Sequence, residues 1–137
     1  MNTKTKMLVV KGDANCGKTT ILKKLSQYLQ DELEYILLSH NAIGNPDKDI
    51  CDLLQNGNRK LVYISTMGDY LKTTVWHCRL TTYNICDLVI CACNNKWTKV
   101  IEAKIPEAIY VEKDENKQFF EEQDLKKLVG IITEICG

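Results

Sequence analysis

The chain has 137 residues, which suffices for one domain with a single core and leaves no room for an accessory lid domain. Its 18 Lys and Arg balance its 18 Asp and Glu, so no overall field favours nucleic acid or an anionic membrane surface. Hydrophobic residues make up 45% of the chain, and neither a secretory signal nor a membrane-length apolar stretch is present, so we expect a folded, cytoplasmic domain.

The first half of the chain predicts three strands and two helices. Residues 6–11 form a short apolar run of buried-strand length, and apolar residues at helical spacing follow the next loop. A second strand is predicted over 33–39, after which Gly44 and Asn45-Pro46 break regular structure. Residues 47–54 predict a short helix, capped by Asp47 or Asp49 and closed by Asn56-Gly57. Residues 59–66 predict a third strand, because they are rich in branched and aromatic side chains.

The second half continues the alternation. A helix is predicted over 70–84, and residues 87–93 form a strand without polar interruption, as expected for a strand covered on both faces. A short helix over 99–104 ends before Pro106. A fifth strand is predicted over 108–112, and a helix with one apolar stripe over 119–136.

Alternating strands and helices predict an α/β fold with a mainly parallel five-stranded sheet and helices on both faces, formed by one domain over 1–137. Ligands of such sheets bind at the carboxyl ends of the strands. Besides the first loop, this rule selects four segments as candidate site regions: His40-Asn41, 65–69, 94–98 and 112–116.

Seven cysteines are scattered, mostly within apolar runs, and no C-x-x-C pair occurs. Cys91 and Cys93 are two apart in a predicted strand, so both side chains point to one face. We therefore expect buried, reduced thiols in a reducing cytoplasm rather than a zinc site.

The loop after the first strand matches the pattern G-x-x-x-x-G-K-[ST] without a mismatch. Glycines let the backbone turn its N–H groups inward, and the following helix adds the positive end of its dipole. This order of strand, glycine-rich loop and helix predicts a site for phosphate groups. The residues in question are Gly12, Asp13, Ala14, Asn15, Cys16, Gly17, Lys18, Thr19 and Thr20.

Over about residues 6–31 the chain resembles the P-loop nucleoside triphosphatases. The resemblance implies a three-layer P-loop fold that binds ATP or GTP with Mg²⁺. It further implies that Lys18 reaches the β- and γ-phosphates and that the Thr19 hydroxyl holds the metal ion.

A P-loop enzyme usually has a second acidic residue at the tip of a neighbouring strand, where it holds magnesium directly or through water. Here that position is Ser65, and the nearest acid is Asp69. Two readings of Asp69 remain open: it is a metal or water ligand, or it caps the helix that begins near Tyr70. Lys18 and Asp69 are therefore the candidate catalytic residues, with Thr19 and Asp69 as candidate metal ligands.

Two segments faintly resemble small GTPase motifs. Residues 65–68 resemble D-x-x-G without its acid, and residues 95–98 resemble N-K-x-D with Thr98 in place of the final acid. The missing carboxylate is the group that accepts both guanine donors, so we expect weak selection between ATP and GTP, with ATP as the usual occupant. Trp97 is expected to pack against the sheet rather than stack on a base.

The sequence thus predicts a protein that binds a magnesium nucleoside triphosphate and hydrolyses it slowly or transfers its phosphoryl group. Three alternatives remain: a nucleotide-gated switch with negligible turnover, a small-molecule kinase covered by residues 40–49, and a degenerate small GTPase. Arg79 is a possible clamp for the γ-phosphate. The sequence identifies neither an acceptor substrate nor a protein partner, and it gives no indication of a nucleic-acid or membrane partner.

Overall fold

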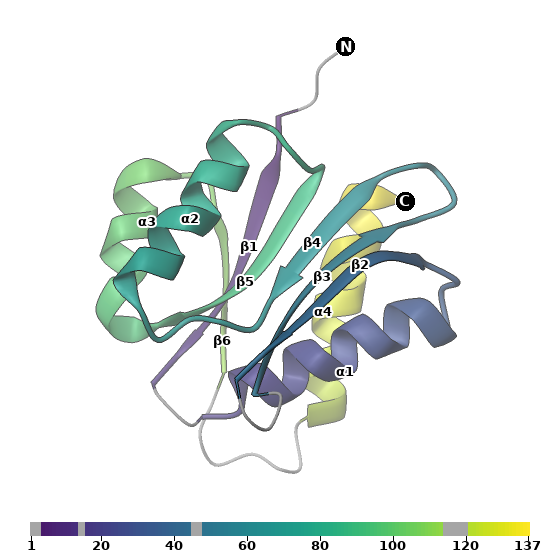
Figure 1. The fold of residues 1–137 in the computed structure, drawn as a ribbon, viewed down its shortest axis with the longest axis horizontal. Helices are drawn as coiled ribbons and strands as arrows, with labels where there is room; N and C mark the ends of the chain where they lie inside the picture. Colours follow the sequence, from purple (N-terminus) through teal and green to yellow (C-terminus); the bar gives the residue numbers. More distant parts are fainter. Residues whose placement is uncertain (1–3, 14–15, 45–47, 114–120) are drawn as a thin grey trace.

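The structure is a computed structural model that describes residues 4–13, 16–44, 48–113 and 121–137. Within these ranges the chain forms a mixed α/β fold with one six-stranded sheet and four α-helices (Figure 1). The strands are β1 (Lys6–Gly12), β2 (Ile36–Ile43), β3 (Asp49–Gln55), β4 (Leu61–Ser65), β5 (Leu88–Asn94) and β6 (Ile109–Glu112). The helices are α1 (Lys18–Asp31), α2 (Leu71–Thr82), α3 (Thr98–Lys104) and α4 (Glu121–Cys136), and a 3₁₀ turn, η1 (Asn95–Trp97), precedes α3.

The strands lie in the order β2-β3-β4-β5-β1-β6. Strands β4, β5, β1 and β6 run parallel to one another, whereas β3 is antiparallel to both β2 and β4. The first strand of the chain therefore lies inside the sheet, between β5 and β6. In this register Gly12 is opposite Asn94, and Ser65 is opposite Cys91, so the loops after β1, β5 and β4 share one edge.

The predicted sheet of five strands is wrong, because residues 49–55 form a strand rather than a helix. Burial alternates along β3, and Ile50, Asp52 and Leu54 point into the protein. The buried carboxylate of Asp52 concealed this alternation in the sequence. Asn56-Gly57, predicted to close a helix, instead begins the turn between β3 and β4, where the Asn56 side chain accepts hydrogen bonds from the backbone N–H groups of Asn58 and Lys60.

Helices cover both faces of the sheet. Figure 1 shows α1 and α4 together on one face and α2 and α3 on the other. The core beneath α1 and α4 receives Leu88, Ile90 and Ala92 of β5, while Cys91 and Cys93 face the cluster beneath α3. Both faces of β5 are therefore covered, as its unbroken hydrophobicity predicts.

The remaining predicted strands and helices are confirmed, with small shifts at their ends. Strand β2 is longer than predicted and runs to Ile43, so His40 and Asn41 lie within it and not in a loop after it. For the proposed cover over residues 40–49, this means that 40–43 are strand, while 45–47 lie outside the described residues. Trp97 packs against the cluster beneath α3, as predicted.

All seven cysteines are free thiols, and six of them are buried. Burial raises the pKa of the Cys91 thiol well above its ordinary value and raises that of Cys136 to about 11. These thiols stay protonated and act as small apolar side chains. Among the described residues no helix is both long enough and apolar enough to cross a membrane.

Candidate functional site

The carboxyl ends of β1 and β5 form the point where the sheet changes the direction of its connections. The helix after β1 lies on one face of the sheet, and the helix after β5 lies on the other (Figure 1). Connections that leave on opposite faces open a crevice between the two strand ends, and such crevices are the usual ligand sites of open α/β sheets.

The backbone at the start of α1 is arranged for an anion. Gly17 precedes the helix with φ of 97°, a left-handed conformation that favours glycine. No side chain caps the helix, and its first turn contains no acidic residue. The N–H groups of Lys18, Thr19 and Thr20 have no partner within the helix, because Ile21 donates the first helical bond, to the Gly17 carbonyl. The positive end of the α1 dipole is thus available to a ligand.

Lys18 adds a full positive charge at the same place. Its side chain is only 6% exposed. Its Nζ donates to the carbonyl oxygens of Gly12 at 2.8 Å and Asp13 at 2.7 Å, and it forms no ion pair with a described residue. A buried ammonium group satisfied only by neutral carbonyls is costly unless an anion compensates it.

A polar cavity of about 260 Å³ opens in front of these groups, and we call it the α1 cavity. It brings together the predicted site residues Lys18, Thr19, Thr20 and Asp69, although Asp69 is 49 residues or more from the others in sequence. Its complete lining is Gly17, Lys18, Thr19, Thr20, Thr66, Gly68 and Asp69.

The other predicted loop residues lie beside this cavity or outside the described chain. Cys16 is buried, with its sulfur against Gly12, where a Cβ atom would lie 2.5 Å from it. The Asp13 carboxylate accepts a hydrogen bond from Asn95 Nδ2 at 2.9 Å, which links the loop after β1 to the segment after β5. Ala14 and Asn15 lie outside the described residues.

The segment after β4 is held close to β5. A Cβ atom on Gly68 would lie 2.6 Å from the Ala92 carbonyl, so only glycine allows this approach. The Gly68 carbonyl accepts a hydrogen bond from the Asn94 backbone N–H at 2.8 Å. The Asn94 side chain donates to Asp69 Oδ1 at 3.4 Å, and Trp97 Nε1 donates to the Asp69 carbonyl at 3.3 Å. These contacts orient Asp69 at the cavity.

The capping hypothesis for Asp69 is wrong. Helix α2 begins at Leu71, its N-cap is Tyr70, and no side chain accepts a capping bond there. Asp69 is one residue too early, and its carboxylate is turned toward β5. Its role as a metal or water ligand stays a prediction. Among the described residues no three His, Cys, Asp or Glu side chains cluster around a common point, and Mg²⁺ needs no such cluster because it usually keeps several of its waters.

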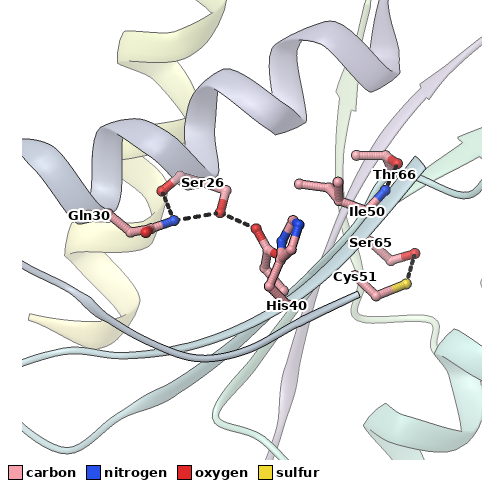
Figure 2. A network of polar contacts seen from close by, with 8 residues as sticks. Ser26, Gln30, His40, Ile50, Cys51, Ser65 and Thr66 are labelled. Carbon is pink, nitrogen blue, oxygen red and sulfur yellow. Dashed lines mark hydrogen bonds and ion pairs between the residues drawn. The ribbon is translucent and has the colours of Figure 1, made fainter. Parts of the chain in front are cut away.

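Thr66, directly after β4, reaches the α1 cavity, whereas Ser65 at the end of β4 does not. Thr66 Oγ1 donates to Asp49 Oδ1 at 2.8 Å. The same oxygen accepts from the Ile50 N–H at 2.9 Å (Figure 2). Ser65 points to the other face, where its hydroxyl lies 3.7 Å from the Cys51 sulfur (Figure 2). Sequence reasoning missed Asp49 as a neighbour of the site, because its position depends on the unrecognised strand β3.

Lys113 belongs to the segment 112–116, which the rule for strand ends selected as a candidate site region. It is 7% exposed. Its Nζ lies 3.3 Å from Asp124 Oδ2, and its Cε is 3.4 Å from the place a Cβ atom on Gly17 would occupy. It thus places a further cation beside the loop. Lys113 lies near the loop because it directly follows β6, which pairs with β1.

The two arginines of the chain are outside the α1 cavity. Arg59 lies in the turn between β3 and β4, at the far end of β4 from Thr66. Arg79 lines a separate groove beside α2. The prediction that Arg79 reaches the γ-phosphate position is therefore not supported by its placement.

No family model matches this chain, and no curated protein or solved structure matches it either.

Proposed function

We propose that the α1 cavity binds a magnesium nucleoside triphosphate, with ATP as the usual occupant, and that the fold is a P-loop fold. One observation carries the proposal: a buried Lys18 ammonium group lies at the uncapped, glycine-initiated end of α1 and has no acidic partner among the described residues. Fixed positive charge and inward N–H groups at one point suit a polyphosphate.

Each residue of the cavity has a role in this proposal. The backbone N–H groups at the start of α1 bind phosphate oxygens, and Lys18 exchanges a carbonyl partner for the β- and γ-phosphates. The Thr19 hydroxyl and the Asp69 carboxylate are hard oxygen donors on one wall, which suits Mg²⁺. The metal ion, when bound, neutralises charge that develops on the phosphate oxygens. Lys113, paired with Asp124, packs beside Gly17 and supports the loop.

Replacement of Lys18 by alanine tests the site. The variant loses the buried charge, and we expect a loss of about 2–5 kcal/mol in the binding of Mg-ATP, with the thermal transition of the protein retained. Isothermal titration calorimetry measures the affinity, and Lys99→Ala, an exposed lysine on α3, is the matched control. Equal affinity of Lys18→Ala and wild type would refute the proposal. The same titration with GTP should give an affinity within about tenfold of that for ATP, since Thr98 cannot accept both guanine donors.

A nucleotide-gated switch with negligible turnover is the second candidate, and two observations favour it. Neither arginine lines the α1 cavity, so the described residues supply no guanidinium group for a transferring phosphoryl. Thr66, on the cavity wall, is hydrogen-bonded to Asp49 at the start of β3, so a ligand that contacts Thr66 also acts on the β2-β3 hairpin.

The rate of nucleotide hydrolysis by the Asp69→Asn variant distinguishes an enzyme from a nucleotide-gated switch. For an enzyme we expect a fall of at least about tenfold in magnesium-dependent phosphate release, while the affinity for nucleotide stays within a few fold, because the amide is a poorer metal ligand of the same shape. Steady-state phosphate release with and without Mg²⁺ is the measurement. If the wild type shows no turnover at any magnesium concentration although it binds Mg-ATP, the switch is the correct description.

A further inference from the structure

A groove of about 890 Å³ lies on the opposite side of residues 65–69 from the α1 cavity. We call it the α2 groove, since α2 forms one wall and the strands β3 and β4 form the other. Successive residues of the connecting segment alternate between the two spaces: Ser65 and Met67 line the groove, whereas Thr66 and Gly68 line the α1 cavity. The groove is within the range of small-molecule sites, about 300–1,000 Å³.

The sheet topology explains why the groove is open. Helix α2 packs on β5 and against α3, and no described helix covers β2 and β3 on this face (Figure 1). The side of α2 that turns toward those strands carries Trp76, whose side chain is half exposed. An indole at the mouth of an apolar groove offers a flat surface for stacking.

The wall of the groove contains a buried polar group without a partner. His77 is 1% exposed, and neither of its ring nitrogens has a hydrogen-bond partner among the residues that the structure describes. The Tyr63 ring lies beside it, with the ring centroids 6.4 Å apart and the planes tilted by 59°. A neutral imidazole has one donor and one acceptor, and a buried polar group left unpaired is rare in folded proteins. The unpaired imidazole therefore marks a polar position in the groove wall that the described residues leave unsatisfied.

The charges of the groove have one sign. Its lining includes the cations Lys72 and Arg79 and no acidic residue. Neither cation forms an ion pair with a described residue. Both cations are exposed, and exposed cations at the border of an apolar groove favour a ligand that carries an anionic group.

We propose that the α2 groove binds a small planar aromatic molecule that carries an anionic group, such as an aromatic carboxylate. The ring stacks on Trp76, and the anion pairs with Arg79 or Lys72. This site is separate from the nucleotide site and stands whether or not the α1 cavity binds nucleotide.

Two probes of equal shape and different charge test the proposal. 2-Naphthoate should bind saturably and at least about tenfold more tightly than the neutral 2-naphthalenemethanol, measured by calorimetry. In an NMR titration the ring nitrogen signals of His77 and the indole signal of Trp76 should shift with the same binding curve. Absence of saturable 2-naphthoate binding, or equal binding of both probes, would overturn the proposal.

Three variants separate the contacts. Trp76→Ala, which removes a half-exposed side chain, should weaken both probes about tenfold or more. The double variant Lys72→Gln, Arg79→Gln should weaken 2-naphthoate by about tenfold and leave 2-naphthalenemethanol unchanged. Lys99→Gln on α3 removes an exposed lysine outside the groove and should change neither. Binding of 2-naphthoate that survives both groove variants would show that the probe binds elsewhere.

Lys18→Ala distinguishes failure of this proposal from failure of the nucleotide proposal. That variant should bind 2-naphthoate as the wild type does, because Lys18 is not part of the groove. If Mg-ATP displaces 2-naphthoate competitively, the groove belongs to the nucleotide site and the separate ligand is refuted.

Discussion

The parallel part of the sheet is deeply buried, whereas its antiparallel edge is exposed. Every residue of β5 is buried, and its side chains enter hydrophobic clusters on both faces. Every residue of β2 is exposed, and Ile36 retains 61% of its accessible surface. The residues that line the α1 cavity follow β1 and β4, and Lys6 is the one exposed residue of these two strands. Rigid, buried strands therefore position the candidate site, whereas the antiparallel edge contributes little hydrophobic burial.

The antiparallel edge is instead attached through a buried carboxylate. Asp52 of β3 is 2% exposed, and it accepts a hydrogen bond from Ser26 Oγ of α1 at 2.6 Å. Its other oxygen lies 2.5 Å from His40 Nδ1 of β2. Gln30 of α1 is hydrogen-bonded to Ser26 in turn, as Figure 2 shows. The carboxylate separates serine from imidazole, so the imidazole cannot take the serine proton directly, and we read the cluster as structural.

A pair of identical substitutions gives the largest expected contrast between the two sides. Ile90→Ala in β5 should lower the free energy of unfolding by about 2–5 kcal/mol, because it leaves a cavity in a core where Ile90 is 0% exposed. Ile36→Ala in β2 should cost less than about 1 kcal/mol, since the side chain is mostly in water already. Urea denaturation monitored by circular dichroism measures both. Equal losses would mean that β2 is covered in solution.

Low pH should destabilise the folded protein, because it protonates the buried imidazole of His77. Burial lowers the pKa of His77 from 6.5 to about 4, so between these values the unfolded chain binds more protons than the folded one. Stability should therefore fall as the pH drops from 6.5 toward 4, by at most about 1.4 kcal/mol per pH unit from this residue. His77→Leu should remove that part of the slope. Urea denaturation of both proteins from pH 7 to 4 is the measurement, and parallel curves would contradict the prediction.

The buried carboxylate should carry a smaller effect, confined to the antiparallel side. Asp52→Ala leaves Ser26 and His40 without their acceptor, and we expect a loss of about 1–3 kcal/mol. Asp52→Asn keeps an acceptor oxygen and should cost less. Amide hydrogen exchange should accelerate in β2 and β3 of Asp52→Ala while β5 keeps its protection. Faster exchange in β5 as well would show that the two sides unfold as one unit.

The parts of the fold that local patterns encode were predictable from the sequence. An apolar run identifies β5, and the spacing of Gly12, Gly17 and Lys18 identifies the loop, because each signal lies within a few consecutive residues. Strand β3 was missed because the reason that Asp52 can be buried, its bonds to Ser26 and His40, lies in other elements.

The rest of the site depends on strand order, which no local pattern specifies. Lys113 lies beside Gly17 because β6 pairs with β1, and Asp49 reaches Thr66 because β3 pairs with β4. The prediction that Asp69 lies at the site is consistent with its place in the cavity lining. The sequence could not exclude helix capping by Asp69, because that depends on whether α2 begins at Tyr70 or at Leu71.

The position of β1 inside the sheet has a consequence for synthesis on the ribosome. Val9 pairs with Cys91 and with Tyr110, so the first strand to be made waits for partners that emerge 82 and 101 residues later. At bacterial-to-eukaryotic elongation rates of about 5–20 residues per second, that wait is roughly 4–20 s. The β2-β3-β4 meander can close early from neighbouring segments. The apolar residues Met7, Leu8, Val9 and Val10 of β1 stay uncovered until β5 and β6 are made.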